Sequence, residues 1–263
     1  MQRGYLILIG GAENNSNDSG ILKHILDVTR AVKIVLIPTA SCYPRDVHRD
    51  YGDTFNVLNI PETTCLDIRD AREADEAHCL AAVEEADLVY FSGGDQVRLV
   101  SKLVRTELLD RIRARFASGS LHIAGTSAGA AAAGNPMIYD GDYKGSFKGS
   151  IGFMEGFGFL DGITIDTHFS ARQRLSRLAQ FLVSGKCEKG IGLDENTGIV
   201  VYPNDEFEVI GADMAVVLNS AAVTGSNYHD IVKDTPLCFN NMKFGFLPPG
   251  TRFSINTWDV LNY

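Results

Sequence analysis

The sequence of 263 residues contains no apolar run close to the length of about 18 residues that a membrane-spanning helix needs. The first apolar run, residues 6–9, is too short for the core of a secretory signal, and two glycines follow it in place of a cleavage site. The sequence also lacks an internal repeat, a low-complexity tract and a flexible linker. We therefore expect a cytoplasmic protein with no membrane partner, organised as a single domain over residues 1–263.

An excess of positive charge is also missing. The chain has 24 Lys and Arg residues against 33 Asp and Glu residues, which gives a formal net charge of −9. Nucleic-acid phosphates favour a basic surface, so we expect no nucleic-acid partner. The five cysteines are odd in number and scattered, without the paired spacing of a metal site. They are typical of reduced cytosolic thiols, and we predict neither a metal nor a cofactor.

Apolar segments with the character of strands alternate with helical segments through the first two thirds of the chain. Alternation of this kind predicts an α/β fold with a doubly wound, mostly parallel sheet covered by helices on both faces. From about residue 198 to residue 263, short β-rich runs separated by polar turns predict an antiparallel extension. The predicted strands cover 5–9, 33–37, 64–68, 87–91, 121–124, 198–202, 207–210, 215–218, 242–247 and 251–255, and the predicted helices cover 20–29, 73–85, 96–118 and 128–133.

Several of the predicted parallel strands end in small or polar residues. These turns cover residues 10–11, 39–41, 93–94 and 125–127. In open α/β sheets, ligands bind beyond the carboxyl ends of the strands. We therefore expect the four turns to gather at one edge of the sheet.

The strongest chemical signal is the segment 124–130, which reads Ala-Gly-Thr-Ser-Ala-Gly-Ala between a predicted strand and a small-residue helix. It fits the Gly-x-Ser-x-Gly nucleophile elbow, in which a tight turn carries Ser127 above the sheet edge. The following residue, Ala128, would begin the helix and point its N–H at a developing oxyanion. The pattern alone is also compatible with a helix cap or a phosphate-binding turn.

A nucleophilic serine needs a base, and His168 is the best candidate among six histidines because it ends an apolar, β-branched run. His24 and His78 fall in predicted helices and His122 in a predicted strand, so we expect these three to be structural. The carboxylate that would orient the imidazole is left open. Glu195 follows an apolar run, and Asp142 lies in the loop after the nucleophile helix.

A basic segment follows His168 directly. In a helix, Arg174 and Arg177 would share a face, whereas Arg172 would lie elsewhere around the axis. A solvated helix face is the usual reason for such a run. Its position beside the candidate base makes carboxylate recognition a hypothesis, since Arg binds carboxylates through two parallel hydrogen bonds. Gln96 is either a first-turn helix residue or a residue that faces substrate.

Five separated motifs together resemble the cyanophycinases, which are peptidases of family S51 in the dipeptidase E clan. The resemblance runs in register from residue 5 into the C-terminal β segment, where 247–253 reads Leu-Pro-Pro-Gly-Thr-Arg-Phe. The motifs are Ile-Gly-Gly-Ala-Glu at 9–13, Phe-Ser-Gly-Gly-Asp-Gln at 91–96, Gly-Thr-Ser-Ala-Gly-Ala at 125–130, Asp-Thr-His-Phe at 166–169 with Arg172 and Arg174, and Gly-Leu-Asp-Glu-Asn-Thr at 192–197.

The resemblance implies a sheet like that of dipeptidase E and the class I glutamine amidotransferases. It implies a serine exopeptidase that cleaves cyanophycin, multi-L-arginyl-poly-L-aspartate, into β-Asp-Arg dipeptides, and a homodimer. On the matching positions, Ser127 would be the nucleophile, His168 the base and Glu195 the acid, although the more distant dipeptidase E pattern favours Asp142. Gly94 and Ala128 would supply the oxyanion N–H groups. The substrate pocket would be lined by Gln96, Asp166, Thr167, Arg172, Arg174 and Arg177.

One position departs from the family pattern, because Thr167 stands where some relatives carry a glutamine. The alternatives to a cyanophycinase are an aspartyl dipeptidase of the dipeptidase E type, a related isopeptide hydrolase and a non-enzymatic binding module. A glutaminase-like amidotransferase domain is disfavoured, because that family needs Cys where this chain has Ser127.

Overall fold

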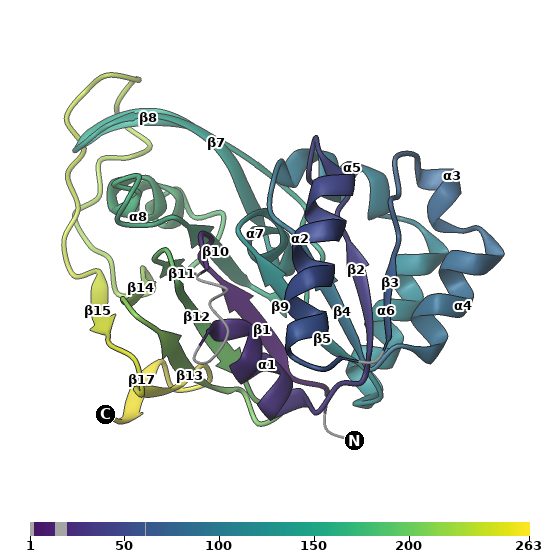
Figure 1. Cartoon of the computed structure of the whole chain (residues 1–263). Coiled ribbons are helices and arrows are strands. Elements are labelled where there is room, and N and C mark those ends of the chain that lie inside the picture. Colours follow the sequence, from purple (N-terminus) through teal and green to yellow (C-terminus); the bar gives the residue numbers. More distant parts are fainter. Residues whose placement is uncertain (1–2, 14–19, 61) are drawn as a thin grey trace.

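A computed structural model describes residues 3–13, 20–60 and 62–263, except for the side chains of residues 142–144. The largest element is a nine-stranded sheet with the strand order β17-β16-β13-β12-β1-β5-β4-β2-β3 (Figure 1). Its parallel half consists of β1 (Leu6–Ile9), β5 (His122–Thr126), β4 (Leu88–Phe91), β2 (Lys33–Ile37) and β3 (Glu62–Cys65). Its antiparallel half consists of β12 (Thr197–Val201), β13 (Glu206–Gly211), β16 (Arg252–Ser254) and β17 (Asp259–Asn262). The predicted α/β class with a parallel sheet and a β-rich C-terminal part is confirmed.

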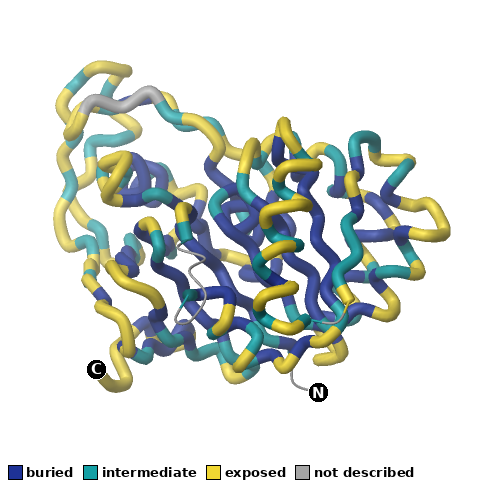
Figure 2. The backbone as a smooth tube through the Cα atoms, viewed as in Figure 1, coloured by how far each residue is buried: buried dark blue, intermediate teal, exposed yellow. Residues whose placement is uncertain are grey.

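Helices cover both faces of the parallel half, because alternate side chains of each strand point to opposite sides. Ile7 and Ile9 pack in one apolar cluster with residues of α1 (Ile21–Thr29) and α2 (Pro44–Val57). Leu6 and Leu8 pack in another, on the opposite face. Figure 2 shows β1 and β4 as buried along their length and β3, at the edge of the sheet, as partly exposed, with the outer sides of the helices exposed. The helices of the second face are α3 (Ala71–Ala74), α4 (Ala77–Glu85), α5 (Gln96–Leu103), α6 (Glu107–Ser118) and α7 (Ala128–Ala133).

A second sheet of six strands, which the sequence did not predict, lies beside the first. Its order is β15-β14-β11-β10-β6-β9. The helix α8 (Leu175–Val183) packs against it, with Leu178 in an apolar cluster with Val216 and Leu218. A hairpin of β7 (Met137–Lys144) and β8 (Phe147–Met154) extends from this part of the molecule (Figure 1). The strands of the second sheet are β6 (Gly134–Asn135), β9 (Leu160–Asp161), β10 (Ile163–Thr167), β11 (Lys189–Leu193), β14 (Ala215–Asn219) and β15 (Lys243–Leu247).

Local capping explains where the predicted helices differ from the observed ones. The single helix predicted over 96–118 is two helices, because Arg105 has a φ of +68° and the Thr106 hydroxyl caps α6 by accepting the Leu109 N–H at 3.2 Å. The helix predicted over 73–85 is also two helices. α2 was not predicted, since its sequence is mostly polar and only Phe55 is buried. The loop expected after the nucleophile helix, which contains Asp142, is part of the β7–β8 hairpin.

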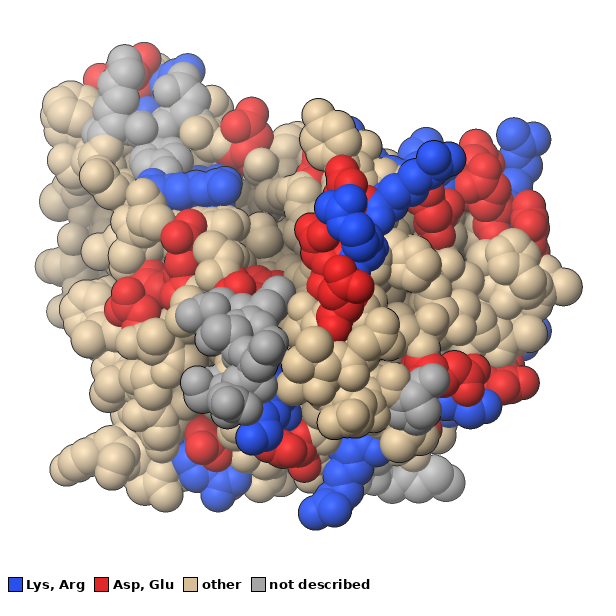
Figure 3. All heavy atoms as spheres, in the orientation of Figure 1, with Lys and Arg blue, Asp and Glu red and all other residues tan. Residues whose placement is uncertain are grey.

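Charged side chains are mixed on the surface. In α2, Arg49 pairs with Asp46 at 3.1 Å and with Asp50 at 3.0 Å. Figure 3 shows acidic and basic groups interspersed over the face turned to the viewer. Among the described residues, no helix has the length and apolar character needed to cross a bilayer.

His122 gives the stability of the fold a defined pH dependence. Its Nδ1 accepts the Tyr5 N–H at 3.0 Å. Burial lowers the pKa of His122, and the Asp87 carboxylate partly opposes this shift. Because the folded pKa lies below the unfolded value of about 6.5, the stabilisation by neutral His122 is present above that pH and is lost as the pH falls.

We therefore expect the free energy of unfolding to fall less steeply between about pH 7 and about pH 5 when His122→Asn removes the titrating ring but keeps an acceptor. Urea denaturation of both proteins over a pH series measures this difference. Equal slopes for the two proteins would show that His122 does not contribute.

Candidate active site

Ser127 lies on a sharp turn between β5 and α7. Its backbone has φ 49° and ψ −105°, a conformation that costs energy for a residue with a side chain. The turn brings strand and helix so close that a Cβ at Gly125 would lie 2.7 Å from the carbonyl carbon of Gly129. A Cβ at Gly129 would lie 2.7 Å from that of Phe91. The two glycines are therefore required by packing, as the nucleophile-elbow pattern predicts.

A chain of hydrogen bonds connects Ser127, His168 and Glu195. Ser127 Oγ and His168 Nε2 are 2.9 Å apart, and His168 Nδ1 and Glu195 Oε1 are 2.7 Å apart. His168 follows β10 and Glu195 follows β11, so both come from the second sheet, whereas Ser127 follows a strand of the first. The His168 side chain is 12% exposed and that of Glu195 is 45% exposed. The hydrogen bonds thus lead from a largely buried imidazole to a carboxylate that is partly exposed to solvent.

The alternative acid, Asp142, lies in β7, where its backbone pairs with that of Ser150. Its side chain is outside the described part of the structure. The hydrogen bond that Glu195 Oε1 accepts from His168 Nδ1 is the observation that favours Glu195 over Asp142 as the orienting group.

The turns after the parallel strands gather around Ser127, as predicted from the topology. The Ser127 N–H donates to the carbonyl of Ile9, and the Asp95 N–H donates to the carbonyl of Ala40, both at 2.9 Å. A Cβ at Gly93 would lie 3.4 Å from the Ser127 Cβ. Gly94 has a φ of +139°, and a Cβ there would overlap the Ala40 carbonyl. Glycine is therefore required at position 94 by both backbone conformation and space.

Two N–H groups near Ser127 are available to an incoming anion. Within the described ranges, no protein acceptor is found for the N–H of Gly94 or for that of Ala128. Ala128 is the first residue of α7, where the helix geometry leaves N–H groups without intrahelical partners. Positive charge from the helix dipole adds to this site, although α7 is short.

Two of the predicted pocket residues, Asp166 and Arg177, are instead paired with each other in the protein interior. Asp166 is 2% exposed and Arg177 is 4% exposed. The guanidinium of Arg177 donates to both carboxylate oxygens, from Nε at 3.1 Å and from Nη2 over a shorter distance. Arg174 Nη1 donates to Asp166 at 3.2 Å and to the carbonyl of Thr167 at 2.5 Å. This ion pair fixes the start of α8 against the end of β10.

The remaining predicted pocket residues differ in their surroundings. Arg172 is exposed and lies in a turn before α8, so the helix predicted for the basic segment begins only after Arg174. The Arg172 N–H donates to the His168 carbonyl at 3.0 Å, which keeps this turn next to the imidazole. Gln96 is half-buried at the start of α5 and donates to the Ile138 carbonyl at 3.3 Å. The Thr167 side chain is buried.

Sequence reasoning missed the role of Asp194, which lies between β11 and the catalytic candidate Glu195. Asp194 is 4% exposed, and its Oδ1 accepts the Ser170 N–H at 2.7 Å. This hydrogen bond holds the turn that follows His168. The sequence does show Asp194 as an acidic residue directly after an apolar strand. Glu195 is adjacent and fits the same description, so the pattern could not tell which of the two has which role.

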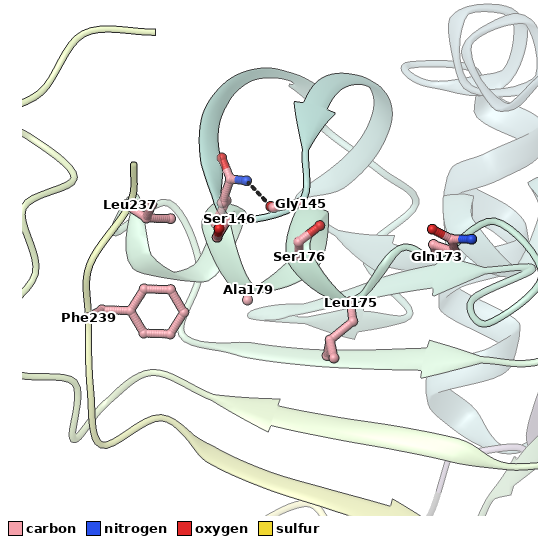
Figure 4. A pocket seen from close by; sticks show the side chains of 9 residues that line it. Gly145, Ser146, Gln173, Leu175, Ser176, Ala179, Leu237 and Phe239 are labelled. Atoms are coloured by element: carbon pink, nitrogen blue, oxygen red, sulfur yellow. Dashed lines mark hydrogen bonds between the residues drawn. The ribbon is translucent and has the colours of Figure 1, made fainter. Parts of the chain in front are cut away.

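A groove of about 390 Å³ lies along the outer side of α8 and contains none of the catalytic candidates. Figure 4 shows Leu237 and Phe239 on one side of it and residues of α8 on the other. Its lining consists of Gly145, Ser146, Gln173, Leu175, Ser176, Ala179, Gln180, Leu237 and Phe239. In the described part of the chain, no group of three or more His, Cys, Asp or Glu side chains could hold a metal ion.

Comparison with known proteins gives consistent results. The sequence model of peptidase family S51 matches residues 6–210. The chain is 31% identical over 259 residues to a cyanophycinase of Geminocystis herdmanii, covering 97% of this chain and 95% of the relative. It is also 31% identical to a cyanophycinase of Trichormus variabilis, covering 97% of this chain and 87% of the relative. A cyanophycinase of Synechococcus elongatus is 29% identical, covering 98% of this chain and 81% of the relative.

Two solved structures share the fold. A peptidase from an acI-B1 Actinobacterium superposes with a TM-score of 0.70 at 22% identity, covering 97% of this chain and 98% of that one. A putative peptidase E protein from Listeria monocytogenes EGD-e superposes with a TM-score of 0.55 at 16% identity, covering 80% of this chain and 100% of that one. At these identities the similarity supports the α/β architecture described above.

The Asp166–Arg177 pair predicts a large stability effect. Asp166→Asn keeps the shape of the side chain but leaves the buried Arg177 guanidinium without its carboxylate partner. We expect the free energy of unfolding to fall by about 3–5 kcal/mol, as measured by urea denaturation. The matched control is Asp259→Asn, which breaks the exposed ion pair with Lys243 and should change stability little. Equal small losses in the two variants would contradict the structural role of Asp166.

Proposed function

The chain belongs to peptidase family S51, and from that premise we propose that it is a serine exopeptidase that cleaves cyanophycin into β-Asp-Arg dipeptides. The observation that carries the proposal is the hydrogen-bonded chain from Ser127 through His168 to Glu195. An acyl-transfer enzyme needs a nucleophile, a base and a group that orients the base, in this order. Several relatives that are similar over nearly the whole chain are cyanophycinases, which supports the choice of substrate.

The proposed reaction begins when the Ser127 hydroxyl donates its proton to His168 Nε2 and Oγ attacks the peptide carbonyl. Glu195 accepts a hydrogen bond from Nδ1–H, which fixes the tautomer and stabilises the imidazolium. The imidazolium then protonates the leaving amine, and the C–N bond breaks to give the acyl-enzyme. A water molecule, deprotonated by His168, attacks the ester carbonyl and releases the product with the free Ser127 hydroxyl.

Charge that develops on the carbonyl oxygen would be held by the N–H groups of Gly94 and Ala128. Ala128 directly follows Ser127, and Gly94 follows Gly93, where a Cβ would lie 3.4 Å from the Ser127 Cβ; neither N–H has an acceptor within the described ranges. Donors that are already in place need no rearrangement during the reaction, which is why such groups lower the barrier effectively. The strained backbone of Ser127 supports the same assignment, since observed outliers of this kind cluster at active sites.

Recognition of the polymer would use both signs of charge. Arg172 and Arg174 lie on the turn that follows His168 and would bind aspartate carboxylates of the substrate. The protein's net charge of −9 would attract the guanidinium groups of cyanophycin. Gln96 and Thr167 would border the same pocket, whereas Asp166 and Arg177 would support it from below.

A second candidate, an aspartyl dipeptidase of the dipeptidase E type or a related isopeptide hydrolase, would share this chemistry. The observation that favours it is Thr167, whose side chain is buried and which is the position where the sequence departs from the family pattern described above. Turnover of Asp-X dipeptides in preference to the polymer would select this function. Assembly as a homodimer, a location in the cytoplasm and organisation as a single domain are further predictions of the sequence.

The function predicts release of dipeptides from insoluble cyanophycin by the purified protein. Ser127→Ala should lower the rate by at least about a thousandfold, because the members of a triad act as a unit. Mass spectrometry of the soluble fraction identifies and counts the product. A wild-type protein that releases no β-Asp-Arg, or an alanine variant with normal turnover, would rule the function out.

The same assay distinguishes the two candidate acids. Glu195→Gln keeps the shape of the side chain but removes the charge opposite the imidazole, and we expect a rate loss of roughly 10⁴-fold. Asp142→Asn is the matched control and should leave the rate within a few-fold of wild type. The reverse pattern would assign Asp142 as the orienting acid.

The proposed carboxylate recognition predicts that lysine cannot replace arginine. Arg172→Lys and Arg174→Lys should each lower kcat/KM by about tenfold or more, because the planar fork that binds a carboxylate is lost. The control Arg111→Lys changes a surface residue of α6 that pairs with Glu107 and should have no effect. Wild-type kinetics in both test variants would remove these two arginines from the proposed pocket.

A further inference from the structure

The loop that follows β1 contacts the backbone of all three segments that carry the proposed triad. Three successive carbonyls, those of Ile9, Gly10 and Gly11, accept N–H groups from Ser127, His168 and Asn196. The distances are 2.9, 2.9 and 2.8 Å. The first donor belongs to the nucleophile, the second to the base, and the third to the neighbour of Glu195. One short stretch of backbone therefore sets the spacing of groups from two different sheets.

The loop also touches the imidazole. Gly11 has a φ of +103°, and a Cβ at this position would lie 2.6 Å from His168 Nε2. There is thus no room between the loop and the ring. A displacement of the loop towards His168 would push the imidazole, and a displacement away would leave it unsupported on that side.

Glu13 anchors the end of this loop through three hydroxyl groups. Its Oε2 accepts the Thr126 hydroxyl at 2.6 Å. Its Oε1 accepts the Tyr90 hydroxyl at 3.1 Å and, over a shorter distance, the Tyr51 hydroxyl. These donors come from β5, β4 and α2, and Thr126 directly precedes Ser127. The carboxylate therefore ties the loop to the strand that carries the nucleophile.

The two tyrosines are well suited to this role. Burial raises the pKa of Tyr51 and Tyr90 well above the ordinary value, and the Glu13 carboxylate raises it further. Both phenols consequently keep their protons and remain donors. Hydrogen bonds to a charged acceptor are stronger than those between neutral groups, so the three together hold the carboxylate firmly.

We propose that Glu13 is a positioning residue for the Ser127–His168 pair, acting through the loop of residues 9–13. The proposal rests on the function proposed above and adds a residue that contacts neither the substrate nor the reacting atoms. It accounts for the acidic residue at the end of the Gly-Gly-Ala-Glu segment, which the proposed catalytic steps do not use.

The test uses the isosteric variants Glu13→Gln and Thr126→Val. An amide presents one acceptor oxygen and an NH₂ group, so Glu13→Gln cannot accept all three hydroxyls. We expect kcat for cyanophycin to fall about tenfold to a hundredfold with KM within twofold, because a displacement of about 1 Å in reacting groups has this effect. Thr126→Ser keeps the hydroxyl and should have a kcat close to that of the wild type. Because both residues act through the same contact, the Glu13→Gln/Thr126→Val double variant should be no slower than the slower single variant.

The matched control is Glu208→Gln in β13. Glu208 also accepts a tyrosine hydroxyl, from Tyr202 at 2.9 Å, but lies away from the loop after β1. It should leave kcat unchanged. Wild-type kcat in both test variants would overturn the positioning role. A rise in KM as large as the fall in kcat, or a fall in kcat in Glu208→Gln equal to that in the test variants, would overturn it as well.

Crystal structures of wild type and Glu13→Gln test the proposal independently of activity. We expect the distance between Ser127 Oγ and His168 Nε2, 2.9 Å here, to lengthen beyond hydrogen-bond reach in the variant. An unchanged distance overturns the inference whatever the activity. If the wild-type protein does not degrade cyanophycin, the proposed function fails, and the two crystal structures still decide the role of Glu13.

Discussion

The contact between two sheets at the end of β1 is the constraint on which the site depends. Ser127 comes from the nine-stranded sheet, and His168 and Glu195 come from the six-stranded one. A hydrogen bond of 2.9 Å between Ser127 and His168 requires the sheets to be held to within a fraction of an ångström. Backbone hydrogen bonds from the loop of residues 9–13, rather than side-chain packing alone, provide that precision. The apolar clusters on both sides of β1 then fix the loop to the core.

Much of the first sheet could be predicted because its signals are local. β-branched runs such as residues 33–37 give strands, and the turns that end them lie at one edge by topology. The second sheet could not be predicted. Its parallel strands β10 and β11 have the same apolar character as the strands of the first sheet. No local pattern shows that they form a separate sheet, or that the strand next to β1 is β12. The β7–β8 hairpin was missed for a different reason: glycines and charged residues interrupt both strands, so neither shows a regular apolar pattern.

The site itself was predicted unevenly. Ser127 was predicted from the Gly-x-Ser-x-Gly pattern. His168, and Glu195 with Asp142 as its alternative, were predicted from their positions after strands or helices of the sheet, where a side chain can reach the sheet edge. The same reasoning could not separate an arginine that faces solvent from one that is neutralised inside the protein. Arg172 is exposed, whereas Arg177 is buried against Asp166, although the two are five positions apart in one basic segment. The path of the backbone between β10 and α8 determines which of the two arginines is exposed. That path depends on tertiary packing, so the local sequence does not show it.

The origin of the site from two sheets has a consequence for divergence within the fold. The elbow and the proposed oxyanion donors Gly94 and Ala128 belong to the parallel layer, while the proposed base and acid and the basic segment belong to the neighbouring layer. The nucleophile and the residues proposed to bind substrate carboxylates are thereby encoded in different parts of the chain. Changes in the turn before α8 or in α8 could alter which acyl group is accepted without repacking the strand that supplies the nucleophile. Substitutions that adapt the site to a new peptide can thus be confined to one layer, while the packing around Ser127 in the other layer stays the same.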